Sequence, residues 1–183
     1  MSNGAGWVLC LVLLSASAHA DSSIIGWFRS LEPWTGVAWE YDDTYIEECL
    51  PCHFPYQPGL LPERSWRALM APEALLNHFG EALTMDEARR AHIVAYLVRN
   101  AADHATFPVS EKIAASLSKE QTPLRITETR YFRRKHHPIP PALISDNPKV
   151  ARFSNCSACH NEAIDGNYDD ATVSIPGYGR WTW

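Results

Sequence analysis

Two short stretches of the sequence share one pattern: Cys49-Leu50-Pro51-Cys52-His53 and Cys156-Ser157-Ala158-Cys159-His160. In each pentad a histidine directly follows the second of two thiols. This spacing is typical of c-type haem attachment, in which the thiols add to the two vinyl groups and the histidine binds the iron. The sequence therefore predicts two covalently attached c-type haems, with the pentad cysteines as attachment points and His53 and His160 as proximal ligands.

Other uses of cysteine explain the pentads less well. A Cys₄ zinc site needs two cysteine pairs about 15–20 residues apart, whereas these pairs lie in opposite halves of the chain. Zinc also leaves the histidine after each pair unexplained. A thioredoxin-like dithiol needs a βαβ context, which the sequence around neither pentad provides. Haem attachment accounts for every residue of the pattern.

The N-terminus predicts export. Residues 7–17 form an apolar run too short to span a bilayer, and Ala18-His19-Ala20 follows the small-x-small pattern of a cleavage site. Met1 to Gly6 contains no Lys or Arg, so an uncleaved anchor is the alternative. We expect residues 1–20 to be a signal peptide, and its cleavage would remove Cys10 from the mature chain. The mature chain would then be periplasmic in a Gram-negative bacterium, without stable membrane insertion.

Charge divides the chain into two halves. The 183 residues carry 16 basic and 21 acidic side chains, a net charge of −5 that argues against nucleic-acid binding. Residues 21–105 hold 6 basic and 13 acidic groups, whereas residues 106–183 hold 10 basic and 8 acidic groups. We predict one haem domain in each segment, 21–105 and 106–183, with unequal haem potentials. A basic stretch from Arg125 to Lys135 would balance propionates or dock an acceptor, unless it is simply a solvated surface.

The predicted fold is mainly α, with two small c-type haem domains and long irregular loops. Pro72 and Gly80 bracket a short helix that carries His78, and Thr84 begins a capping box for the most clearly indicated helix, which runs to about residue 102. Ser110 can cap another short helix. The proline-rich segment 122–145 is expected to be extended, and the second pentad to end a helix entered near residues 146–148. Residues 21–39 form an aromatic lead-in.

The sixth ligand of each iron decides between electron transfer and ligand binding. His78 lies on an apolar face soon after the first pentad, which favours it for the first haem. His136 is favoured over His137 for the second, because Pro138 restricts the backbone of the residue before it. The other candidates fit surface or core positions as well as ligation: His92, His104, Met70 and Met85.

The sequence resembles the DHC family, the exported dihaem cytochromes c of proteobacteria. The resemblance spans about residues 48–176. It rests on the two pentads and on shared runs at 58–62, 64–66, 78–80, 95–97, 123–127, 134–136, 147–150 and 154–155. It departs from the family at His137, where an acidic residue is expected.

The resemblance implies two mostly helical domains with bis-histidine haems, and it makes His78 and His136 the distal ligands. Such proteins shuttle electrons, in some bacteria with a monohaem oxygen-binding cytochrome called sphaeroides haem protein or with a membrane cytochrome b. We therefore expect an electron-transfer protein rather than an enzyme, with no catalytic residues. The alternative is a dihaem peroxidase or an O₂- or NO-binding haem enzyme with one open iron.

Overall fold

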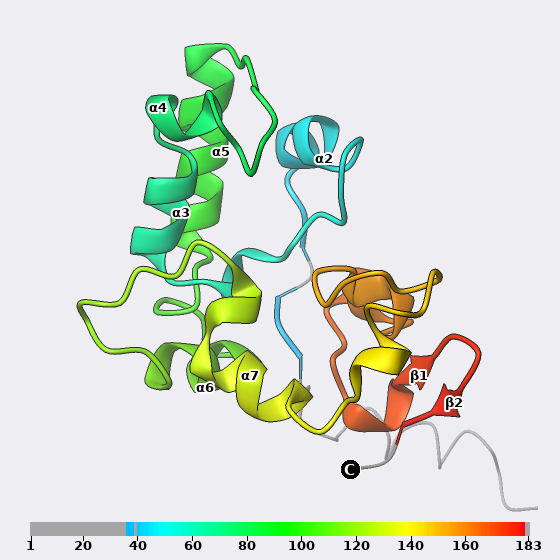
Figure 1. Ribbon diagram of the computed structural model, residues 1–183. Coiled ribbons are helices and arrows are strands. Elements are labelled where there is room, and N and C mark those ends of the chain that lie inside the picture. The colour runs from blue at the N-terminus through cyan, green and yellow to red at the C-terminus, as the bar shows by residue number, and fades with distance from the viewer. Residues whose placement is uncertain (1–35, 39, 182–183) are drawn as a thin grey trace, which may run out of the picture. The chain divides into compact units, whose positions relative to one another are not determined.

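The computed structural model describes residues 36–38 and 40–181. The expected signal peptide and most of the aromatic lead-in 21–39 lie outside the described residues. The described chain is mainly helical, as the sequence predicts (Figure 1). Its α-helices are α2 (Asp43–Cys49), α3 (Glu63–Leu69), α4 (Pro72–Leu75), α5 (Glu87–Arg99), α6 (Pro108–Ala115) and α7 (Arg130–His136). Within this part of the chain, no helix is both long and apolar enough to cross a membrane.

Short 3₁₀ helices and one ribbon make up the remaining regular structure. The 3₁₀ helices are η1 (Pro58–Leu60), η2 (Ile126–Glu128), η3 (Pro141–Leu143), η4 (Cys156–Ala158), η5 (Ala163–Asp165) and η6 (Asp170–Thr172). Strand β1 (Ser174–Ile175) pairs antiparallel with β2 (Gly179–Arg180), with Ser174 opposite Arg180. The second pentad therefore lies among short turns (Figure 1).

Helices α3 and α5 run side by side and bury the first of three apolar clusters (Figure 1). This N-terminal cluster includes Trp66, Leu69, Ile93 and Leu97. A central cluster is formed by Val37, Leu60, Ala102, Val109 and Ile113, and a C-terminal cluster by Ile144, Val150 and Ile175. The central cluster takes residues from both sides of position 105. The division into domains 21–105 and 106–183 stays a prediction.

Two helices begin at residues other than those the sequence indicated. The longest, α5, begins at Glu87 because the Asp86 carboxylate accepts the N–H groups of Ala88 and Arg89 at 2.9 and 3.2 Å, so Thr84 is not its cap. Helix α6 begins at Pro108, and Ser110 lies within it rather than at its start. Both starts nevertheless follow known preferences, an N-cap aspartate and a proline at the first helical position.

The expected helix that carries His78 is wrong. Helix α4 ends at Leu75, and His78 lies in the turn that follows. There the His78 N–H donates to the Glu81 carbonyl at 2.7 Å, and the Asn77 side chain accepts the Gly80 N–H at 3.0 Å. Phe79 and Gly80 both have positive φ angles, of 56° and 107°, which a continuing right-handed helix does not allow.

Two expectations for the second half are also wrong. Part of segment 122–145 is helical, because Thr129 caps α7 by accepting the Phe132 N–H at 3.2 Å, and 130–136 holds neither proline nor glycine. Conversely, no helix leads into the second pentad. Residues 147–151 form a turn that ends at Ala151, whose φ of 64° is left-handed.

Candidate haem sites

The first pentad continues the turn of α2. Asp42 caps this helix by accepting the Tyr45 N–H at 3.0 Å, and the helix ends at Cys49. The N–H groups of Cys52 and His53 then both donate to the Cys49 carbonyl at 3.3 Å. Residues three and four apart in such a turn lie on one face, so the two thiols and the imidazole share a side of the chain.

The second pentad makes the same turn in a different setting. The N–H groups of Cys159 and His160 donate to the Cys156 carbonyl at 3.2 and 2.9 Å. The Cys159 carbonyl in turn accepts the N–H of Ser174, the first residue of β1, at 2.9 Å. An α-helix positions the first pentad, whereas a β-bridge between His160 and Val173 helps to position the second.

A second imidazole faces each pentad histidine. The ring centroids of His53 and His78 lie 6.3 Å apart at an interplanar angle of 22°, and those of His160 and His136 lie 6.1 Å apart at 60°. A metal–imidazole bond is about 2.0–2.1 Å long, so two rings on opposite faces of one iron have centroids roughly 6 Å apart. Both pairs fit this separation. The first site comprises His53, His78, Cys49 and Cys52. The second site comprises His160, His136, Cys156 and Cys159.

One histidine in each pair has its tautomer fixed by a backbone carbonyl. The Nδ1–H of His53 donates to the Phe54 carbonyl at 2.7 Å, and the Nδ1–H of His136 donates to the Phe132 carbonyl at 2.9 Å. Each bond keeps the proton on Nδ1, so that Nε2 carries the lone pair through which an imidazole binds a metal. Nδ1 of His160, by contrast, is buried without a hydrogen-bond partner among the described residues.

The structure separates His136 from its neighbour. His136 lies in the last turn of α7 and stacks on Phe132, with ring centroids 3.8 Å apart at 10°. Phe153 packs edge-on against both rings at 5.8 Å. His137 caps the C-terminus of the helix and is exposed. The structure therefore brings His136, and not His137, to the second pentad.

The remaining candidates lie elsewhere. Nε2 of His92 is 2.7 Å from an Asp42 carboxylate oxygen, and Nε2 of His104 is 2.7 Å from a Glu63 carboxylate oxygen. Met70 is buried in the N-terminal cluster, and Met85 packs against that cluster. Surface contacts with carboxylates account for the two histidines, and core packing accounts for the two methionines.

A pocket that is partly open to solvent adjoins the second site. His136, His160 and both cysteines line it, together with an apolar wall suited to a porphyrin face: Leu60, Val109, Ile113, Ile126, Ile139, Ile144, Val150, Val173 and Ile175.

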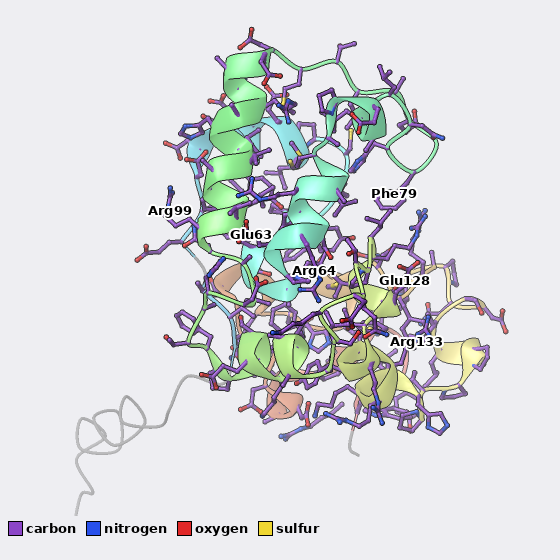
Figure 2. The ribbon with its side chains drawn as sticks, turned by 90° about the vertical axis from the view of Figure 1, so that its left-hand side faces the viewer. Glu63, Arg64, Phe79, Arg99, Glu128 and Arg133 are labelled. Atoms are coloured by element: carbon purple, nitrogen blue, oxygen red, sulfur yellow. The ribbon has the colours of Figure 1, made fainter. Side chains whose placement is uncertain are left out.

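The first site is more exposed, because Cys52 is exposed whereas Cys156 and Cys159 are half-buried. A hollow adjoins His78 and is lined by Leu69, Phe79 and Leu124 among others, but neither pentad cysteine nor His53 borders it. Phe79 is 48% and Leu124 is 43% exposed. Figure 2 shows Phe79 reaching from the turn after α4 toward the segment of Glu128, and the guanidinium of Arg125 lies 4.0 Å from its ring centroid.

Burial favours the neutral form of the imidazoles of the second site. Burial, together with the nearby His136, lowers the pKa of His160 to about 4. Burial also lowers the pKa of His136 and, in the first site, that of His78. Neutral imidazole is the form that binds iron, so these environments suit ligation at neutral pH.

The thiols lack the features of a zinc or dithiol centre. Burial raises the pKa of both Cys49 and Cys156 to about 12, although reactive dithiols and zinc-bound cysteines are favoured by a lowered pKa. The four described cysteines form no disulfide. Across residues 36–38 and 40–181, no group of three or more His, Cys, Asp or Glu side chains is placed to hold a metal ion.

Comparison with known proteins agrees with this chemistry. The family model for dihaem cytochrome c matches residues 45–168. The chain belongs to the dihaem cytochrome c family. It is 41% identical to a diheme cytochrome c from Shewanella baltica over 76% of this chain and 97% of that one, with a TM-score of 0.61. It is 42% identical to a diheme cytochrome c from Rhodobacter sphaeroides over 73% and 99%, with a TM-score of 0.62. No curated protein sequence matches the chain.

Membership of the dihaem cytochrome c family confirms the predicted cofactors, two c-type haems. The pentads do not indicate the aromatic rings and carbonyls that hold the histidines. One signal is present in the sequence, because Phe132 and His136 are four residues apart and share a helical face. The prolines of segment 122–145 hide this signal, since they favour an extended chain.

Proposed function

We propose that this dihaem cytochrome c carries single electrons between redox partners, with both irons closed by two histidines. The proposed axial pairs are His53 with His78 and His160 with His136. The four pentad cysteines are the proposed attachment points. The observation that carries this proposal is the second imidazole opposite each pentad, at centroid distances of 6.3 and 6.1 Å.

The chain supplies ligands, orientation and burial, whereas each bound haem supplies a one-electron iron couple. The carbonyls of Phe54 and Phe132 hold two of the ligand rings in the tautomer that binds metal. The apolar wall of the second site limits the access of water. Such groups hold an iron in one coordination state, as an electron carrier requires.

An enzymatic role needs an iron with an open or easily opened coordination position. In each site a histidine occupies the side facing the pentad, which supports electron transfer over a peroxidase or a small-ligand enzyme. We also propose that the mature protein begins at Asp21 and acts in the periplasm. The support is the apolar segment and small-x-small pattern of residues 1–20.

The proposed partners are redox proteins, either a monohaem oxygen-binding cytochrome of the sphaeroides haem protein type or a membrane cytochrome b. Support comes from membership of the dihaem cytochrome c family. We further propose that residues 21–105 and 106–183 each hold one haem. Each segment contains one complete pentad and its facing histidine.

Single substitutions of the distal histidines test the assignment. In His78→Ala and in His136→Ala, one haem of the two should change from low-spin to high-spin and bind carbon monoxide. His92→Ala and His137→Ala are matched controls and should keep the parent's visible spectrum. A distal variant that also keeps that spectrum would show that the assignment is wrong. Carbon monoxide binding by the parent would favour an enzyme with an open iron.

A further inference from the structure

Three side chains connect the two sites: Tyr56, Gln57 and Tyr168, which together we call the tyrosine bridge. Two of them are neighbours in the segment that leaves the first pentad, and the third follows the second pentad. Each tyrosine ring lies against one pentad histidine, and each phenol makes a hydrogen bond that crosses between the two halves of the chain.

Tyr56 runs from the first proximal histidine to the second pentad. Its ring stacks on the His53 imidazole, with centroids 5.2 Å apart at 29°. Its hydroxyl donates to the Ser154 carbonyl at 2.7 Å. The same carbonyl oxygen lies 3.7 Å from Sγ of Cys156. A series of close contacts therefore joins the imidazole of one site to an attachment sulfur of the other.

Gln57 and Tyr168 make a second connection. Gln57 is fully buried, and its Oε1 accepts the Tyr168 hydroxyl at 2.7 Å. The amide nitrogen of Gln57 donates to the Tyr41 hydroxyl and to the Ala163 carbonyl. The Tyr168 ring lies against His160, with centroids 5.2 Å apart at 59°. Both ends of the tyrosine bridge thus contact proposed iron ligands.

The surrounding structure fixes the tyrosine bridge in place. Pro55 and Pro58 flank it, and each restricts its own φ angle. The hydroxyl of Tyr45, a residue 3% exposed, donates to the Tyr56 carbonyl at 2.7 Å. Satisfying a buried amide would explain the bonds of Gln57. It would not explain why each tyrosine ring also packs on a pentad histidine.

We propose that the tyrosine bridge sets the rate at which an electron passes between the two haems. It holds the second pentad at a fixed position relative to His53. It also replaces gaps between the two sites with close contacts, and the rate of electron tunnelling falls steeply with the width of such gaps. The step balances simply, because one iron is oxidised as the other is reduced and the tyrosines stay neutral. Tyr56 and Tyr168 are positioning residues. The inference rests on the proposed electron-transfer function.

The test compares three phenol deletions in the mature dihaem protein. Tyr56→Phe keeps the ring on His53 but removes the bond to Ser154, and Tyr168→Phe removes the bond to Gln57. Tyr96→Phe is the matched control, because its hydroxyl also donates to a backbone carbonyl, that of Glu40 at 3.0 Å, within the first half. Electron exchange between the haems of half-reduced protein is measured by NMR, beside the visible spectrum and the unfolding midpoint.

We expect Tyr56→Phe to slow the exchange several-fold and Tyr168→Phe to slow it less. Tyr96→Phe should lower the unfolding midpoint similarly while exchanging at the parent's rate. A merely structural role would lower the midpoint of all three and leave the exchange unchanged, which would overturn the tyrosine bridge alone. If the Tyr56→Phe protein does not fold with both haems attached, an unchanged exchange rate in Tyr168→Phe also overturns the proposed role of the tyrosine bridge. A parent protein without any exchange would overturn the proposed function as well.

Discussion

The two haem sites use the same pentad turn and the same facing histidine, yet they differ in enclosure. The second site opens onto a pocket with an apolar wall, and both of its cysteines are half-buried. In the first site Cys52 is exposed, and the hollow beside His78 is bordered by half-exposed side chains such as Phe79 and Leu124. The pentad fixes how a haem is attached, whereas the surrounding chain determines how much water reaches it.

The two sites also differ in nearby charge. Glu47 and Glu48 precede the first pentad and pair with Arg89 at 2.8 and 2.6 Å. At the second site Arg152, Lys135 and Asp170 line the cavity, where Lys135 pairs with Asp170 at 2.6 Å and Arg152 adds a further positive charge. Oxidised iron carries one more positive charge than reduced iron. Burial and a nearby cation both disfavour that charge, so the second haem should have the higher potential.

The largest expected difference concerns packing. Ile175 is 1% exposed and lines the second cavity, so Ile175→Ala should cost about 2–5 kcal/mol of unfolding free energy. Leu124 is 43% exposed beside the first site, so Leu124→Ala should cost less than about 0.5 kcal/mol. Denaturant unfolding of the holoprotein measures both. Equal losses would contradict the difference in enclosure.

The next prediction concerns the haem potentials. Arg152→Gln removes a cation that lines the second cavity, which should lower the higher of the two potentials by roughly 30–60 mV, equivalent to about 0.7–1.4 kcal/mol. Potentiometric titration with visible spectroscopy resolves the two steps. Arg99→Gln is the control, because Arg99 lies in the last turn of α5 and does not line the second cavity (Figure 2). A shift of the lower potential instead would reverse the assignment.

A smaller effect on stability is expected at Asp42, which caps the helix leading into the first pentad. Burial opposes ionisation of Asp42, but hydrogen bonds from His92 and the Tyr45 N–H lower its pKa overall. A lowered carboxyl pKa contributes stability above the ordinary value of about 3.9, and this contribution is lost as the pH falls through the folded-state pKa. Asp42→Asn keeps the helix cap and should cost less than about 1 kcal/mol at pH 7. The cost should vanish in acid.

Chemical denaturation across the acid range measures that difference. Asp169→Asn, at the cap of η6 in the second half, is the matched control for loss of a capping carboxylate. A difference between Asp42→Asn and the parent that grew as the pH fell would contradict the account. It would mean that the Asp42 charge destabilises the fold.

The smallest effect concerns backbone strain next to the second pentad. Ala151 has a φ of 64°, which costs a non-glycine residue about 1–2 kcal/mol, partly offset by the greater freedom of glycine in the unfolded chain. Ala151→Gly should therefore stabilise the protein by up to about 1 kcal/mol in thermal unfolding. A clear loss of stability would show that the Ala151 side chain contributes packing that outweighs the strain.

The features that could be predicted from the sequence are those that depend on local patterns. The pentads, Pro72 and Pro108 at helix starts, and the basic residues at the end of α7 act within a few neighbours. Errors arose where two local signals competed. The prolines after residue 137 masked the Thr129 cap, and Pro72 with Gly80 suggested a helix where Asn77 instead stabilises a turn.

Contacts between distant segments could not be predicted from one sequence. The bond between Tyr168 and Gln57 joins residues 111 positions apart, and that between Tyr56 and Ser154 joins residues 98 apart. No periodicity encodes such pairings, because they depend on how the turns after each pentad fold back. The pairing of His136 with His160 is also a contact between distant segments, although the need of the iron for a sixth ligand made His136 a candidate.

The visible spectrum of the mature protein, oxidised and reduced, with and without carbon monoxide, tests most directly whether both irons are closed. We expect low-spin c-type spectra for both haems and no change on adding carbon monoxide, because His78 and His136 close the two irons. A carbon monoxide shift in about half of the haem would contradict this expectation and show that one of the two sites is open.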